Sequence, residues 1–290
     1  MMKPTIAIAG CGKVGTTFGN HLSGKGYAIK GISCRTLPSA QAAARLLNTA
    51  NFSVTPWEIT GDADVVFIAT PDGKIQENCE EIAKHHGFKK GAIVFHCSGS
   101  QPSTILASAE KEGAITGSLH PLQSFASVKL TDNPFKGIIM AAEGAPLAMG
   151  IARNIAAELE SVFIEIRTDA KTLYHASAVV ASNYLVALIG FSFDLINEAG
   201  ISEKDAMSVL RPLIKGTLDN IEKVGVVNAL TGPIVRGDVS TVTRHLDQIR
   251  ERQPGLVDMY KILGRYAVGL TKKRNELDPQ KINELVDLLK

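Results

Sequence analysis

The chain has 290 residues, of which 45% are apolar and 21% are charged. This length is greater than one compact domain usually requires, and the composition is that of a folded globular protein. The formal net charge of only +2 argues against a nucleic-acid partner, because such partners normally bind a basic face. The densest basic cluster, residues 272–276, is expected to be a solvated helix end.

Cysteine usage and hydropathy bear on the compartment. The four cysteines have no CxxC spacing and are expected to be reduced thiols in a cytoplasmic protein. No leader is expected, because the first apolar run is already a strand. Residues Ala176 to Phe193 are uncharged over about the length of a membrane span, but this stretch contains Ser182 and Asn183. We therefore predict a helix buried on all sides within a helical domain, and no membrane partner.

Short apolar runs alternate with helical patterns from residue 4 to residue 166, which is typical of a parallel sheet covered by helices. Two of these runs, 65–69 and 92–95, are continuously apolar, as expected for central strands that are covered on both faces. The predicted strands lie at about 4–9, 27–33, 53–57, 64–69, 92–97, 115–119, 137–142 and 162–166.

Helical patterns fill the intervals between these strands, and after residue 167 they continue alone. The longest ends at Ala199-Gly200, where glycine supplies the left-handed C-terminal position. The predicted helices lie at about 13–25, 38–48, 73–86, 102–112, 145–160, 170–198, 202–223, 239–252, 254–274 and 279–289. The sequence therefore predicts an α/β fold in which a doubly wound, mostly parallel sheet (residues 1–168) precedes an all-α domain (residues 169–290).

A glycine-rich turn joins the first predicted strand to the first predicted helix. In Gly10-Cys11-Gly12-Lys13-Val14-Gly15 the first glycine permits a tight turn, the second admits a phosphate and the third allows close packing. Because a strand precedes the motif and a helix follows it, the pattern indicates a dinucleotide with its pyrophosphate at the helix start. A glycine turn without a ligand is the alternative.

The residues that follow two other strands refine this cofactor prediction. Where an NAD site usually has an acid, the chain has Ser33, Arg35 and Thr36. A guanidinium can hold a phosphate through two charge-assisted hydrogen bonds, and the hydroxyls can complete the site, so NADP(H) is predicted rather than NAD(H). Thr70-Pro71 lies where the chain passes the cofactor in open parallel sheets. A proline that simply starts the next helix is the alternative for this pair.

Candidate reaction groups follow the later strands and lie on the long helix. Ser98 follows the fifth strand, His120 follows the sixth, and His175 and Asn183 share a wide helix face at about 80° from each other. Imidazole titrates near neutrality, so His175 can donate a proton to an oxygen or imine nitrogen as hydride arrives. Ser98, His120 and Asn183 are predicted to orient the substrate. A structural role is the alternative for each histidine, and an amide bonded to a helix end is the alternative for Asn183.

Residues 230–238 form an irregular stretch among the predicted helices. Arg236 lies there between two glycines and can bind a substrate carboxylate or the cofactor, although a plain turn with a solvated arginine is the alternative. The seven histidines show no metal-binding spacing, so no metal site is predicted. Ser98 and Cys97 are outside any nucleophile-elbow pattern, which argues against a hydrolase.

Five segments together resemble a known superfamily. They are GCGKVG at 10–15, HCSGS at 96–100, SLHPLQSF at 118–125, YHASAVVASNYLVAL at 174–188 and ALTGPIVRGD at 229–238. The N-terminal half resembles the 6-phosphogluconate and 3-hydroxyacid dehydrogenases, pyrroline-5-carboxylate reductase and the deazaflavin-dependent NADP oxidoreductases. The whole chain is similar to a branch in which a Rossmann-like domain precedes a helical domain of unknown function.

The resemblance implies hydride transfer, NADP(H) and a homodimer formed through a helical domain of the 6-phosphogluconate dehydrogenase C-terminal type. It also implies that Ser98 stands where hydroxyacid dehydrogenases carry a substrate-binding serine. The catalytic lysine of those enzymes falls on His175, so an imidazole replaces an ammonium here. Lys171, one helical turn earlier, is the reserve candidate for the proton donor.

We therefore predict an NADPH-dependent reductase of a small 2-oxo acid or a related imine, with the substrate between the two domains. A ketopantoate reductase-like activity is one concrete possibility. The alternative is a non-catalytic NADP(H)-binding sensor or partner protein, which would explain the missing lysine.

Overall fold

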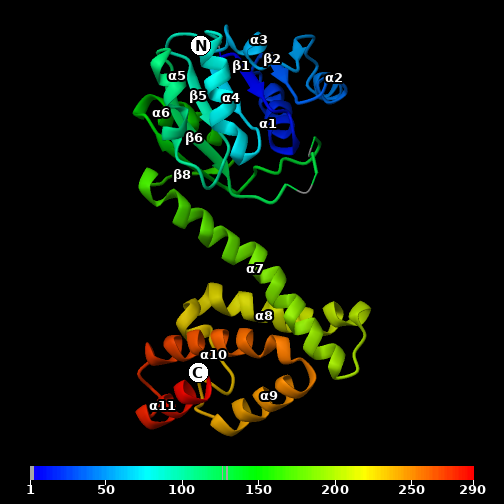
Figure 1. Ribbon diagram of the computed structural model, residues 1–290, viewed down its shortest axis with the longest axis vertical. Helices are drawn as coiled ribbons and strands as arrows, with labels where there is room; N and C mark the ends of the chain where they lie inside the picture. The colour runs from blue at the N-terminus through cyan, green and yellow to red at the C-terminus, as the bar shows by residue number, and fades with distance from the viewer. Residues whose placement is uncertain (1–2, 126, 129) are drawn as a thin grey trace. The chain divides into compact units, whose positions relative to one another are not determined.

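The computed structural model describes residues 3–125, 127–128 and 130–290, and the chain divides into two compact units. The first unit, Met1–Ala181, holds a sheet whose described strands have the order β3-β2-β1-β4-β5-β6-β7-β8 (Figure 1). These strands are β1 (Ile6–Ala9), β2 (Ile29–Ser33), β3 (Phe52–Ser53), β4 (Val65–Ile68), β5 (Ile93–His96), β6 (Ile115–Pro121), β7 (Ile139–Gly144) and β8 (Val162–Glu165).

The directions and the order of the strands indicate at which edge of the sheet a ligand would bind. Among the described strands β6 and β7 are antiparallel, and the other neighbouring pairs are parallel. Parallel neighbours need a long crossover connection, which a helix usually supplies. The strand order reverses between β1 and β4, and ligands of open α/β sheets bind outside the carboxyl ends of the strands at such a point.

Helices cover both faces of the sheet (Figure 1). The helices described in this unit are α1 (Lys13–Gly24), α2 (Leu37–Leu46), α3 (Trp57–Thr60), α4 (Asp72–Lys84), η1 (Ser103–Leu106), α5 (Ala107–Lys111), α6 (Pro146–Glu158), η2 (Thr168–Ala170) and the start of α7 (Lys171–Glu198). On one face α1, α2 and α6 pack around Phe18, Phe67 and Phe95, whose successive ring centroids are 5.3 and 5.7 Å apart. On the other face α3, α4 and α5 bury Ile75 and Ile82. Apolar burial on both faces stabilises the sheet, as its continuously apolar strands require.

The predicted fold class is confirmed, and a strand lies in each of the eight predicted intervals. One interval differs in detail, because the predicted strand at 53–57 is only Phe52–Ser53 and α3 follows it. Pro56 has φ −65° and ψ −35°, so its fixed φ begins a helical turn. Helix α3 is not among the predicted helices, because residues 52–57 alternate apolar and polar side chains as a strand does.

The second unit, Ser182–Lys290, is helical. Beyond the end of α7 it contains α8 (Glu203–Ala229), α9 (Val239–Arg252), η3 (Pro254–Leu256), α10 (Val257–Lys272) and α11 (Pro279–Leu288). Its buried core comes from α9, α10 and α11, with Val242, Leu246, Val268 and Leu285 among its members. At Gly225 the backbone of α8 is interrupted, with φ 76° and ψ 162°, a conformation that glycine adopts without a side-chain clash.

The basic cluster at 272–276 contains a capping residue. Arg274 Nε donates to the carbonyl oxygen of Val227 at 2.8 Å, and Nη2 donates to those of Asn228 and Leu230, both at 2.7 Å. These oxygens lie at the end of α8, where carbonyl groups lack partners within the helix. The prediction of a merely solvated helix end is therefore wrong for Arg274, because its guanidinium bonds to these carbonyl oxygens. The pattern around residue 274 could not show this, since the partners lie more than forty residues earlier in the chain.

The long helix α7 has the predicted extent but not the predicted burial. The segment Thr168–Glu198 is long and apolar enough to cross a membrane, with a mean hydropathy of 1.8, yet only 6% of its most apolar stretch is buried. Val180 and Val186 are 58% and 70% exposed. Burial on all sides is therefore wrong for the single chain, in which these apolar side chains are exposed.

The division between the two units falls inside α7, after Ala181, whereas the sequence analysis places the domain boundary after residue 168. The first turns of α7 contact the sheet unit, since Lys171 pairs with Glu143 and Tyr174 bonds to His120. These contacts attach the start of the helix to the first unit.

Candidate functional site

The glycine-rich loop connects β1 to α1 at the carboxyl end of the sheet. Gly10 has φ +101°, and a Cβ there would lie 2.8 Å from backbone atoms of Ala69 and Thr70. A Cβ at Gly15 would lie 2.3 Å from the carbonyl oxygen of Gly10. At Gly12 a Cβ would meet nothing within 4 Å. Packing therefore requires the first and third glycines, whereas the second lies on an open side of the loop that a ligand can approach.

The start of α1 offers hydrogen-bond donors on this open side. Gly12 is the N-cap, no side chain caps the helix, and Lys13 and Val14 form its first turn. The N–H groups of a first turn have no partner within the helix. Thr70 Oγ1 is buried without a hydrogen-bond partner among the described residues, and the backbone of Thr70 adjoins Gly10. The free donors and this unpaired hydroxyl fit a pyrophosphate bound at a helix N-terminus.

The end of β2 is joined to the same loop. The carbonyl oxygen of Ser33 accepts hydrogen bonds from the N–H groups of Gly10 and Cys11, at 2.9 and 3.0 Å. Cys34 Sγ donates to the carbonyl oxygen of Cys11 at 3.7 Å, and a hydrogen bond with the Cys11 thiol lowers the pKa of Cys34 to about 7. Arg35 follows directly and is exposed, so its guanidinium is available beside the loop.

Three of the predicted cofactor residues have structural roles within the chain. Thr36 is the N-cap of α2, where its Oγ1 accepts from the N–H of Ser39 at 3.4 Å. Pro71 immediately precedes α4, which is the alternative given above for this residue. The side chain of Ser33 is buried. A cofactor contact of any of the three remains a prediction.

The structure brings three of the predicted reaction residues together beyond the carboxyl ends of β5 and β6. A Cβ on Gly99 would lie 2.7 Å from Cδ2 of His175 and 2.8 Å from Nε2 of His120. The two imidazole centroids are 6.4 Å apart. Ser98 is the neighbour of Gly99 in this loop. We call Ser98, His120 and His175 the histidine cluster; only glycine fits between its two rings.

Asp72, which the sequence analysis missed, adjoins the histidine cluster. Its Oδ2 accepts from the hydroxyls of Ser98 and Ser100, both at 2.8 Å. Ser98 Oγ in turn accepts from the N–H groups of Ser100 and Gln101, both at 3.1 Å. In this structure Ser98 therefore holds its own loop and Asp72 together, and its contact with a substrate remains a prediction. The sequence contains a signal for Asp72, because this acid directly follows Thr70-Pro71, the pair predicted to lie beside the cofactor.

Two histidines near this edge are neutral at neutral pH. Burial, followed by the positive charge of Lys171, lowers the pKa of His120 to about 4 and that of His96 also to about 4. His96 Nδ1 accepts from the N–H of Ser98 at 3.2 Å. Its Nε2 is buried and has no hydrogen-bond partner in the described part of the chain. Neutral imidazoles donate and accept hydrogen bonds but do not act as imidazolium acids.

Lys171, the reserve candidate for the proton donor, is enclosed by protein groups. Lys171 and Glu143 are each 1% exposed, and Lys171 Nζ donates to Ser118 Oγ and to Glu143 Oε1, the latter at 3.3 Å. Burial would raise the pKa of Glu143, but hydrogen bonds from Ser118 and Ser103 and the charge of Lys171 outweigh it and lower that pKa. The signal that sequence analysis missed was Glu143 itself, an acid that directly follows an apolar run.

Two predicted residues lie elsewhere. Asn183 and Arg236 belong to the second unit, where both are exposed, so the roles given to them remain predictions. In the part of the chain that the structure describes, no group of three or more His, Cys, Asp or Glu is placed to hold a metal ion. Burial raises the pKa of Cys97 to about 12, which keeps this thiol protonated.

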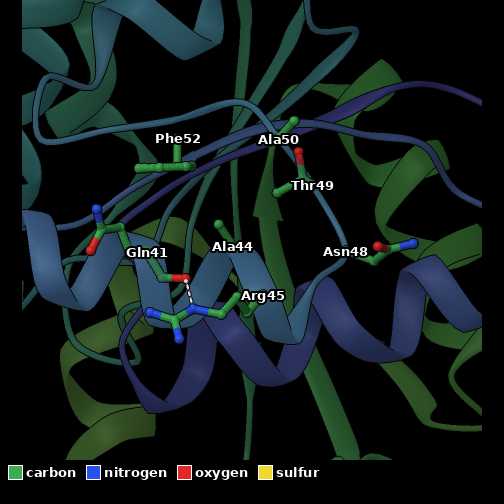
Figure 2. Close-up of a pocket in the computed structure, with 7 residues that line it drawn as sticks. All are labelled: Gln41, Ala44, Arg45, Asn48, Thr49, Ala50 and Phe52. Carbon is green, nitrogen blue, oxygen red and sulfur yellow. Dashed lines mark hydrogen bonds between the residues drawn. The ribbon is translucent and has the colours of Figure 1, made fainter.

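Two depressions lie apart from the histidine cluster. One of them, of about 690 Å³, lies along α2 and the loop after it (Figure 2). Arg45 Nε there donates to the carbonyl oxygen of Gln41 at 3.4 Å. Because α2 returns from the carboxyl end of β2 to the start of β3, Asn48 and Thr49 lie toward the opposite end of the sheet from the glycine-rich loop. The other depression, of about 560 Å³, is lined by apolar side chains of α7, α9 and α10 in the helical unit.

Two family models match the chain. Residues 2–121 match the model of a Rossmann-like domain, and residues 138–267 match that of a domain of unknown function, DUF2520. The chain therefore combines these two domains. No curated protein matches the chain.

Solved structures resemble the chain over nearly its whole length. Protein TM1727 from Thermotoga maritima is 26% identical, with 94% of this chain and 100% of that one covered and a TM-score of 0.72. BF3122 from Bacteroides fragilis, provisionally named an NADP oxidoreductase, is 22% identical over 92% and 98% of the two chains, with a TM-score of 0.73. An imine reductase from Myxococcus stipitatus in complex with NADP+ is 16% identical over 99% and 100%, with a TM-score of 0.65.

Proposed function

We propose that this chain, in which a Rossmann-like domain precedes a DUF2520 domain, is an NADP(H)-dependent oxidoreductase. It reduces the C=O bond of a small 2-oxo acid, such as one of the ketopantoate type, or the C=N bond of an imine. One observation carries the proposal: the open glycine-rich loop, which follows β1, and the histidine cluster, at the ends of β5 and β6, lie at the same carboxyl edge of the sheet, with β4 between β1 and β5. The similarity to an imine reductase that binds NADP+ supports the cofactor and the C=N substrate class.

Residues around the loop fit the cofactor. The open face at Gly12 and the first turn of α1 would bind the pyrophosphate, and the unpaired hydroxyl of Thr70 would hydrogen-bond it. Arg35 would bind the 2′-phosphate that distinguishes NADP(H) from NAD(H). The N-terminus of α2 begins two residues after Arg35. NADPH, when bound, supplies the hydride.

His175 is the proposed proton donor. After hydride adds to the substrate carbon, the oxygen or nitrogen needs one proton, and an imidazole is suited to supply it near neutral pH. His175 lies against Gly99 at the carboxyl edge, whereas the ammonium of Lys171 is enclosed with Glu143.

A reduction assay tests this proposal. Purified protein is mixed with NADPH and a panel of 2-oxo acids and cyclic imines, and the loss of NADPH absorbance is followed. We expect turnover with one of these classes, and a fall in kcat of about 100-fold or more in His175→Ala with an unchanged Kd for NADPH. His86→Ala, at a histidine that is 84% exposed, is the matched control.

Two other outcomes would change the assignment. Full activity of His175→Ala would remove this residue from its role. Tight NADPH binding without turnover on any panel member would favour the alternative, a non-catalytic NADP(H)-binding sensor.

We further propose that the chain is a cytoplasmic homodimer formed through its helical unit. Val186, Leu213 and Val226 of α7 and α8 are 70%, 68% and 52% exposed. Monomeric soluble proteins rarely leave large apolar patches open to water, and a second copy of the same helices would cover these side chains. Polar Ser182 and Asn183 in the middle of α7 favour a protein partner over a lipid one. The free thiols of the described cysteines support a reducing compartment.

A further inference from the structure

His120 and Tyr174 form a pair that neither the proposed function nor the sequence motifs explain. His120 lies near the end of β6, and Tyr174 lies in the first turn of α7. Tyr174 Oη is 3.2 Å from His120 Nδ1, and the two rings meet edge-on at 86° with centroids 5.8 Å apart. The other ring nitrogen, Nε2, faces Gly99, where a Cβ would lie 2.8 Å from it. Nδ1 therefore contacts the helix, and Nε2 faces the loop at the carboxyl edge.

The surroundings of His120 decide which atom carries the proton. Burial, then the charges of Lys171 and His175, lower its pKa to about 4, while Asp72 acts in the opposite direction. The imidazole is therefore neutral at neutral pH and has a single N–H. A phenol is a stronger hydrogen-bond donor than a neutral imidazole, and an imidazole nitrogen is the better acceptor. Donation from Tyr174 to Nδ1 leaves the ring proton on Nε2.

We infer that Tyr174 is a positioning residue: its phenol donates to Nδ1 of His120 and holds the ring in its Nε2–H form, so that His120 offers a hydrogen bond to the substrate heteroatom. This inference rests on the proposed function, because it assigns the donor used when a C=O or C=N bond is reduced. As hydride adds to carbon, the π electron pair of that bond moves onto the heteroatom. His120 stabilises this developing charge without losing its proton, and the proton that completes the product comes from His175.

The opposite arrangement would be unproductive. If Nδ1–H donated to Tyr174, Nε2 would carry a lone pair toward the carboxyl edge. A lone pair repels a heteroatom that is gaining negative charge. The direction of one hydrogen bond therefore decides whether His120 assists or opposes the reaction.

Nitrogen NMR of the side chain tests the inference without any substrate. In 15N-labelled protein between pH 6 and 8, we expect His120 to show a protonated Nε2 and an unprotonated Nδ1, with His120→Gln identifying its signals by their loss. In Tyr174→Phe, which keeps the ring, the two nitrogen shifts should move toward each other as both neutral forms become populated. A protonated Nδ1 in the wild type, or unchanged shifts in Tyr174→Phe, would overturn the inference.

A double-mutant cycle adds a functional readout. We expect Tyr174→Phe to lower kcat about 10-fold with an unchanged Kd for NADPH. Glutamine at position 120 keeps an N–H donor near the place of Nε2 and needs no help from the phenol, so Tyr174→Phe should have no further effect in His120→Gln. Tyr184→Phe, at a tyrosine that is 62% exposed on the same helix, is the matched control. If no substrate is turned over, the proposed function fails, whereas the NMR result still decides the inference.

Discussion

At the residue scale, His96 is a buried base whose protonation opposes folding. Its side chain is fully buried, and burial followed by the charge of Lys171 lowers its pKa from 6.5 to about 4. Between these two values the unfolded chain binds a proton that the folded chain does not. The free energy of unfolding therefore falls as the pH falls through this window.

Replacing this residue should remove that part of the pH dependence. Between pH 7 and pH 5 we expect the wild type to lose about 2 kcal/mol more stability than His96→Asn. Asparagine can still accept the hydrogen bond from the N–H of Ser98, but it does not titrate. Urea unfolding of both proteins at the two pH values measures the difference. Equal losses in the two proteins would show that His96 does not contribute to the pH dependence of stability.

At the scale of elements, the ion pair of Lys171 and Glu143 attaches the start of α7 to the sheet. Glu143 lies on β7, and Lys171 also donates to Ser118 on β6. Glu143 accepts from the N–H and the hydroxyl of Ser103, at 2.8 and 2.7 Å, and from Thr168 at 2.9 Å. The network therefore joins two strands, η1 and the start of α7, the helix that carries Tyr174 and His175.

Breaking this pair should be costly. We expect Lys171→Met to lower the free energy of unfolding by about 3–5 kcal/mol, because it leaves a buried carboxylate without its cation. The double variant Lys171→Met/Glu143→Gln removes that charge and should recover at least about 1 kcal/mol of the loss. As a control, Lys215→Met breaks an exposed pair with Asp219 and should cost less than about 1 kcal/mol. A Lys171→Met protein as stable as the wild type would contradict this account.

Most elements could be predicted because their signals are local. Strands such as Val65–Ile68 are apolar at every position, and the glycine-rich motif predicts both the strand before it and the helix after it. Polar networks could not be predicted in the same way. Asp72 and Ser98 are 26 residues apart, and Glu143 and Lys171 are 28 apart, so only the order of the strands brings them together.

At the scale of the whole molecule, the exposed apolar side chains of α7 and α8 are the feature that the sequence could not place. Apolar composition predicts burial but does not say whether the same chain or another one supplies the cover. In the single chain, Val186 and Leu213 are uncovered. We propose that a second copy of the chain covers these side chains.

The oligomeric state tests this proposal. Sedimentation equilibrium at micromolar concentration should give twice the mass of one chain, because the apolar area would otherwise face water. Val186→Glu/Leu213→Glu should shift the protein to the monomer. Leu147→Glu, at a leucine of α6 that is 68% exposed in the other unit, should leave the mass unchanged. A wild type that is monomeric at these concentrations would contradict the proposal.

The most direct test of the central claim is calorimetric titration of NADPH and NADH into the wild type and Arg35→Ala. The wild type should bind NADPH more tightly than NADH. Removing the guanidinium should weaken NADPH binding by about 10- to 100-fold, the value of one charge-assisted phosphate contact, and leave NADH binding unchanged. Arg45→Ala on α2 is the matched control. Absence of NADPH binding by the wild type, or an undiminished preference of Arg35→Ala for NADPH over NADH, would contradict the account.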